Sequence, residues 1–139
     1  MTKFLTGLMK QTDHTSAVES FIIACSDETT ALTTGTAKVS FRMPYDFILK
    51  AGEAGVRASC NQAPTGAVLT VDINDSGTTI MTSTKLTIAI SSTTSVGGTP
   101  PVLTDVNLAS NALMTVDIDQ IGSSNAGTGL KIILIGQKA

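Results

Sequence analysis

The chain has 139 residues, a net charge of -2 and a pI near 5.1. Its length fits one domain with a real core, and its acidic balance argues against a nucleic-acid-binding surface, which needs a basic stripe. A hydrophobic content of 42% excludes a disordered chain, and no apolar run approaches the roughly 18 residues that span a membrane.

The first 20 residues differ from the rest of the chain, and we predict an N-terminal arm over 1–20. Phe4, Leu5, Leu8 and Met9 recur at the spacing of one face of a short helix. A segment with so few apolar anchors cannot fold alone. It is a frayed terminus, a helix that caps one end of the domain, or an arm that docks onto a partner. We expect no signal peptide, because no long apolar region follows Lys3.

Residues 21–139 alternate apolar and polar side chains over short runs, the pattern of β-strands. No stretch after residue 20 favours a helix. The long connection 91–105, with its two prolines, is of the kind that crosses between sheets. The chain therefore predicts an all-β, jelly-roll-like antiparallel β-sandwich over 21–139. The predicted strands are 21–25, 37–42, 46–50, 55–60, 67–74, 78–81, 84–90, 112–119 and 130–136. The side chains predicted to face inward are Val39, Phe41, Leu69, Val71, Ile73, Leu86, Ile88, Ile90, Met114, Val116 and Ile118.

Two cysteines, Cys25 and Cys60, lie in apolar, strand-like stretches. With no sign of export, two buried thiols are favoured over one disulfide.

The stretch "DINDSG", residues 72–77, has the oxygen side chains and the glycine that begin a calcium loop of the EF-hand type. Such a loop needs an acidic ligand at its twelfth position. That position is Ser83 when counted from Asp72, and Thr128 when counted from Asp117 in the similar stretch "DIDQIG". The flanks also alternate as strands rather than helices, so the EF-hand motif fails in chemistry and in context.

A strand followed by a turn explains the same residues. Asp72 and Asn74 are two residues apart, so we expect both on the wet face of a strand. Gly77 then supplies the positive φ that a hairpin needs. The same reasoning covers Asp117 and Asp119, with Gly122 after them. A looser calcium site at the sheet edge, near Asp72 or Asp117, remains an alternative.

Catalytic chemistry has little support in the sequence. The one histidine, His14, lies in the arm, and no Cys/His spacing fits zinc. Asp72 and Asp117 could form a glycosidase pair if their strands were neighbours. An aromatic content of 4%, with no Trp, argues against a sugar cleft. We expect no enzyme, no cofactor and no metal.

One run, "ACSDETTALTTGTAKVSFRMPYDF", is similar to a segment of bacteriophage virion proteins common in marine and freshwater phages, including cyanophages. The similarity covers most of the chain after residue 20. The stretch 49–62 departs from it, being longer than the tight turn expected there, and the arm falls outside it. The similar segments are 24–47, 63–74, 83–90 and 116–136.

The resemblance implies a small jelly-roll module of a virion, homotrimeric and assembled in the host cytoplasm. The charge and the lack of a long apolar run add that we expect no nucleic-acid and no membrane partner. The implied role of the module is capsid decoration, in which the protein binds the major capsid protein and stabilises the shell. We expect the arm to reach that shell through Phe4, Leu5, Leu8 and Met9. The alternative is a tail-fibre or head-fibre module that binds a receptor or glycan. Its loops would be 61–66, 75–77 and 91–105.

Overall fold

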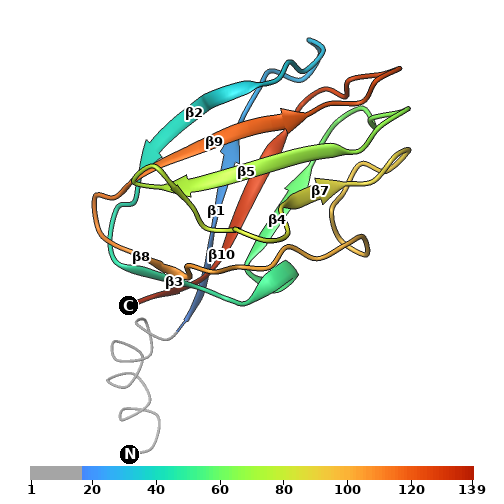
Figure 1. Ribbon diagram of the computed structural model, residues 1–139. Helices are drawn as coiled ribbons and strands as arrows, with labels where there is room; N and C mark the ends of the chain where they lie inside the picture. The colour runs from blue at the N-terminus through green and yellow to red at the C-terminus, as the bar shows by residue number, and fades with distance from the viewer. Residues whose placement is uncertain (1–16) are drawn as a thin grey trace, which may run out of the picture.

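The computed structural model describes residues 17–139 (Figure 1). The predicted arm contacts Phe4, Leu5, Leu8 and Met9 therefore lie outside the described residues. The strands are β1 (Val18–Ala24), β2 (Gly35–Arg42), β3 (Phe47–Leu49), β4 (Val56–Ser59), β5 (Leu69–Asp75), β6 (Thr78–Thr79), β7 (Leu86–Ile88), β8 (Asn107–Leu108), β9 (Leu113–Gln120) and β10 (Lys131–Lys138). In this part of the chain a single 3-10 turn, η1 (Gly52–Ala54), is the only helical element.

The strands form two antiparallel sheets of five strands each. Sheet A has the order β1-β10-β3-β8, with β4 also beside β10, and sheet B has the order β2-β9-β5-β6, with β7 also beside β5. The pairs β1/β10, β2/β9, β3/β8 and β5/β7 are nested, as in one long hairpin rolled up on itself. This nesting is the jelly-roll arrangement, and it confirms the predicted all-β sandwich.

Every predicted strand is present in some form, although several are shorter than predicted. The strand at 78–81 ends at Thr79, and Ile80 and Met81 then enter the core. The prediction that Ile90 faces inward is wrong, because β7 ends at Ile88 and the Ile90 side chain is 48% exposed. Strand β8 was not predicted, since two residues are too few to show an alternating pattern.

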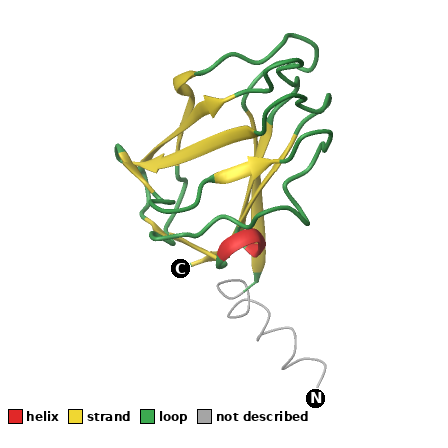
Figure 2. Cartoon of the chain, turned by 45° about the vertical axis from the view of Figure 1, so that its right-hand side comes forward, coloured by secondary structure: helices red, strands yellow, loops and turns green. Residues whose placement is uncertain are grey.

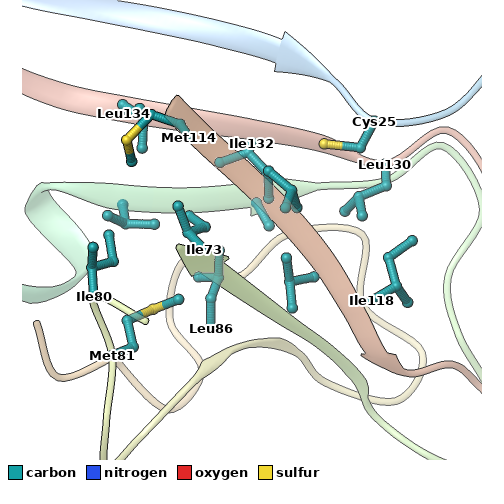
Figure 3. Packing of buried hydrophobic residues seen from close by; sticks show 14 of the residues in the cluster. Cys25, Ile73, Ile80, Met81, Leu86, Met114, Ile118, Leu130, Ile132 and Leu134 are labelled. Atoms are coloured by element: carbon teal, nitrogen blue, oxygen red, sulfur yellow. The ribbon is translucent and has the colours of Figure 1, made fainter. Parts of the chain in front are cut away.

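The core lies between the two sheets (Figure 3). Both sheets contribute side chains to this core, because every second residue of a strand faces the partner sheet. Sheet B contributes the predicted residues of β5, β7 and β9, and sheet A contributes β3, β4 and β10. The largest fully buried side chains are Phe47, Leu69, Ile73, Ile80, Met81, Leu86, Ile88, Leu108, Met114, Ile118, Leu130 and Ile132.

An aromatic cluster closes the sandwich at the end where β1 begins. The rings of Phe21 and Phe47 meet edge to face with centroids 5.0 Å apart. Tyr45 packs against Phe21 and donates its hydroxyl to Glu19 at 2.9 Å. The ammonium of Lys138 lies 5.1 Å from the Tyr45 ring. The cluster thus joins the start of β1 to the last residues of β10.

The two thiols are free and buried. Ala24 of β1 and Ser59 of β4 both pair with Lys131 of β10, from opposite sides. Cys25 and Cys60 each follow one of these residues in the chain, so they too lie on opposite sides of β10. Two strand spacings separate them, roughly 10 Å, which is beyond the reach of a disulfide. Burial raises the pKa of Cys25 to about 12 and also raises the pKa of Cys60. Neither thiol is therefore a ready nucleophile.

The connection after β7 crosses from sheet B to sheet A, as the sequence predicts. It runs back beside the β6–β7 segment, where Val102 N–H donates to Thr84 at 3.1 Å and Thr104 N–H donates to Ile80 at 2.7 Å. Figure 2 shows that most other long loops gather at the end of the sandwich far from the C-terminus.

Candidate functional site

The hairpin after β5 turns within "NDSG", as the sequence predicts, and the turn has two central residues. Ser76 and Gly77 connect Asp75 to Thr78, and their φ angles are +50° and +89°. Left-handed φ at both central residues defines the turn that suits the twist of a tight hairpin. The "DINDSG" stretch is thus a strand and its turn.

The position of Asp72 differs from the prediction. Its side chain faces away from Val71 and Ile73, as expected, but the residue is only 7% exposed rather than wet. Lys85 donates to one of its carboxylate oxygens at 2.6 Å, and the Thr79 hydroxyl donates to the other. The segment from β6 to β7 brings these two side chains over the carboxylate and covers it.

Asp117 faces Asp72 directly across the β5/β9 register, so the two carboxylates are neighbours. Asp117 accepts from the Asn74 side chain at 3.0 Å and from the backbone N–H of Ala37 at 2.7 Å. Ala37 has a φ of +48° within the bulge of β2, so Asp117 holds that bulge in place. All four oxygens of the pair accept bonds that build the fold. A glycosidase pair would need them directed at a substrate.

The pKa of Asp119 is raised, first by partial burial and then by the negative charges of Asp72 and Asp117. A raised pKa means that the charged carboxylate costs stability. The cost begins as the pH rises above the unfolded value of 3.8 and is complete above the folded pKa. We therefore expect Asp119→Asn to stabilise the protein at pH 7 by ~0.5 kcal/mol, a small gain because Asp119 is exposed and solvent screens it.

Urea denaturation of the wild type and Asp119→Asn at pH 7 and at pH 3 measures this effect. The two unfolding free energies should differ at pH 7 and converge at pH 3, where both states of the wild type are protonated. An equal difference at both pH values would contradict the electrostatic cause.

No group of three His, Cys, Asp or Glu side chains within residues 17–139 is placed to hold a metal ion. Ser83 and Thr128, at the twelfth positions of the two calcium-like stretches, add no carboxylate. His14 lies outside the described residues. The calcium alternative near Asp72 or Asp117 gains no support here, because protein donors already bind both carboxylates.

Gly122 has a different role from Gly77. Its φ is not left-handed, and a Cβ there would lie 1.8 Å from the backbone oxygen of Asn125. Glycine is needed for this close approach. The prediction of a turn glycine with positive φ at this position is wrong, because the chain after β9 enters a folded connection instead of a tight turn.

The three loops of the predicted receptor site do not come together. Loops 61–66 and 91–105 meet where Ser91 N–H donates to Pro64 at 2.8 Å, beside the bond from Thr65 N–H to Asn125 at 3.0 Å. Loop 75–77 lies at the opposite end of β5. One ligand cannot contact all three.

Among the hollows of the described surface, one lies beside β3 and another under the β1–β2 loop. The first, of about 270 Å³, is lined by Ile48, Leu108 and the C-terminal Ala139 among others. The second, of about 220 Å³, lies under the β1–β2 loop and is lined partly by Asp27 and hydroxyl side chains. Asp27 caps that loop by accepting from Thr29 N–H and Thr30 N–H, and these bonds lower its pKa. One of its oxygens, Oδ1, thus supports the loop itself.

The most distinctive surface is the outer face of sheet A. The register places Ile22 of β1 beside Ile133 of β10, and it sets Val18 and Ile48 on either side of Gln137. Val18 is 58% exposed, Ile22 is 69% exposed and Ile48 is 37% exposed, while Ile133 and Ile135 between them are half-buried. We call these five residues, Val18, Ile22, Ile48, Ile133 and Ile135, the aliphatic face.

The outer face of sheet B is polar at the equivalent positions. Lys38, Ser40 and Arg42 point outward from β2, and Asp117 and Asp119 point outward from β9. Leu113 of β9, 40% exposed, is an apolar exception on this side, and Arg57 and Lys131 are charged exceptions on the outer face of sheet A. The outer face of sheet A is therefore the more aliphatic of the two. Contiguous exposed aliphatic patches are typical of interaction sites.

Sequence reasoning missed the aliphatic face, although a signal was present. The runs "FIIAC" and "LKIILIG" are apolar at nearly every position instead of every second one. Such runs are typical of strands covered on both faces. The runs were predicted as strands, with no side assigned to their apolar residues.

No helix within residues 17–139 is both long and apolar enough to cross a bilayer. Comparison of the chain with models of protein families, with curated proteins and with solved structures finds no significant match.

Proposed function

We propose that this chain is a non-enzymatic decoration (cement) protein of a bacteriophage particle. It binds the outside of the shell formed by the major capsid protein and acts there as a homotrimer. The observation that carries the proposal is the aliphatic face, an apolar surface on one side of a domain whose other side is polar. The resemblance of 24–47 and the later segments to phage virion proteins supplies the phage context.

The fold is compatible with this role. Jelly rolls occur in viral capsid domains and in lectins, so fold alone suggests both structural and binding functions. The carboxylates of Asp72 and Asp117 in sheet B accept hydrogen bonds from other parts of the fold. A decoration protein works by adding binding free energy at many equivalent sites, where modest contacts suffice because they are multivalent.

The asymmetry of the sandwich suggests an orientation on the particle. The aliphatic face would lie against the shell, and the polar face of sheet B would face the solvent. The arm residues Phe4, Leu5, Leu8 and Met9 would add a second apolar contact to the shell. In this orientation the described loops do not contact the shell.

A matched pair of variants tests this attachment. Ile22→Lys places a charge on the aliphatic face, in the edge strand β1, and Ser40→Lys places the same charge on the polar face, in the edge strand β2. Burying an unpaired charge costs several kcal/mol, so we expect Ile22→Lys to weaken co-sedimentation with undecorated particles at least about tenfold. Ser40→Lys should bind like the wild type. Equal binding by all three proteins would rule out the aliphatic face as the attachment site.

Copy number separates decoration from the fibre alternative. Quantitative mass spectrometry of particles of the encoding phage should find the chain in numbers comparable to the major capsid protein. A few copies per particle would instead favour a receptor- or glycan-binding fibre module. Absence from the particle would refute both virion roles.

A further inference from the structure

The aliphatic face lies at the corner of the domain where residues 1–16 join it. Val18, which begins β1, is itself a member of this face. The register places Val18 in one row with Gln137 and Ile48, and the next rows toward the centre hold Ile135 and Ile22. Of the charged members of the outer face, Arg57 pairs with Ile133 and so lies in the same row as Ile22, while Lys131 lies one row beyond it.

The first hollow continues the same surface. Ile48 belongs both to the aliphatic face and to the wall of this hollow, where Leu108 and Ala139 also lie. Ala139 N–H donates to Asp46 at 2.9 Å and so fixes the C-terminal residue beside β3. The domain therefore offers a shallow, mainly aliphatic surface that also holds Gln137 and Arg57. It has one deeper place for a large side chain, which Asp46 and Asn107 also line.

Residues 1–16 have the composition that such a surface would bind. Their apolar residues Phe4, Leu5, Leu8 and Met9 have the spacing that puts them in one stripe of a helical segment, and the polar run "QTDHTS", 11–16, lies between them and β1 in the sequence. Six extended residues reach about 20 Å. The aliphatic face extends about 10 Å across three strands and about 13 Å along β1. The polar run is thus long enough to let the stripe fold back over it.

We propose that, in the free subunit, residues 1–16 fold back so that this stripe packs on the aliphatic face of the same chain, with one large side chain in the hollow beside Ile48. A segment tethered next to its site has an effective concentration in the millimolar range, which favours its own face over that of a second copy. The packing concerns the free subunit alone. Its release on the shell, which would expose both apolar surfaces for attachment, rests on the proposed function.

Spin labelling of the free, full-length protein tests the packing. Lys10 follows the stripe in the sequence, and its spacing is that of the opposite side of a helical repeat, so Lys10→Cys should accept a nitroxide without altering the stripe. Cys25 and Cys60 are buried, with raised pKa values, and leave the new thiol as the reactive one. We expect the methyl signals of Ile22, Ile48, Ile133 and Ile135 to lose most of their intensity. Ile73 and Ile88, in sheet B, should keep more of theirs.

A second pair of variants tests the role of the stripe. Leu5→Ser with Leu8→Ser in the labelled chain should restore the methyl signals, whereas Thr2→Ser with Thr6→Ser should leave them broadened. Persistent broadening in the first variant, or none in the parent, would overturn the proposal. A mixture of spin-labelled chains and isotope-labelled chains without the spin label should show no broadening. Broadening in that mixture would show that a second copy's segment occupies the face, which also overturns the proposal. No particle is used, so the result is independent of whether the chain decorates a shell.

Discussion

Gly136→Ala should destabilise the protein by about 3 kcal/mol or more, and we expect the variant to accumulate poorly as folded protein. Gly136 lies in β10 between Glu19 of β1 and Leu49 of β3. A Cβ at this position would lie 2.0 Å from the backbone oxygen of Ile48 and 2.9 Å from the Cα of Leu49. Backbone atoms of a neighbouring strand cannot move aside as a side chain can, so the clash must separate β3 from β10.

The site of the clash explains the size of the effect. Strand β10 pairs with β4 over 131–134 and with β3 over 136–138, so Gly136 lies where one neighbour replaces the other. Lys50 N–H donates to Ile135 at 3.0 Å at this change of partner. Displacement of β3 would also move Ile48 and the hollow beside it, so the aliphatic face would lose the residue that β3 contributes.

Urea denaturation monitored by circular dichroism measures the loss. Gly98→Ala is the matched control, because its Cβ would meet only the Ser95 oxygen, at the ordinary contact distance of 3.4 Å. We expect that variant to stay within about 0.5 kcal/mol of the wild type. Similar unfolding free energies for the two variants would show that β3 can move and that the close approach is not required.

The sequence predicted the sheets well where one face of a strand is buried and the other is wet. In β5 and β9 the alternation identifies both the strand and its inward side chains, because a repeat of two residues matches the strand, whose successive side chains point to opposite faces. The same rule fails at the end of β7, since Ile90 continues the pattern after the strand has ended. It also fails for β8, whose two residues contain no period.

The surfaces were harder to predict, because they depend on contacts between distant segments. The burial of Asp72 requires Lys85, which lies 13 residues away. The need for glycine at 136 arises from β3, and nothing in "LIGQK" indicates that strand. The aliphatic face is made by β1, β3 and β10, which come from both ends of the chain. Its apolar runs are visible in the sequence. Which of their residues face away from the core could be recognised only once the pairing of the strands was known.

The second large effect concerns the covered carboxylate on sheet B. Asp72→Ala should cost about 3 kcal/mol, since it leaves the ammonium of Lys85 and the hydroxyl of Thr79 without their shared acceptor. The side chains of Asp72 and Lys85 are 10% and 28% exposed, so water replaces the lost bonds only in part. The cost therefore lies above that of a surface ion pair, which is about 0–1 kcal/mol.

A double-mutant cycle tests the cause of this loss. Lys85→Ala alone leaves the Asp72 carboxylate covered and beside Asp117 without its cation, so it should also destabilise the protein. The double variant Asp72→Ala with Lys85→Ala removes both charges and should cost less than the sum of the single variants by about 1–2 kcal/mol. Urea denaturation of the four proteins at pH 7 gives the coupling free energy. Additive losses would mean that Asp72 acts through packing alone, and the segment between β6 and β7 would then need another anchor to sheet B.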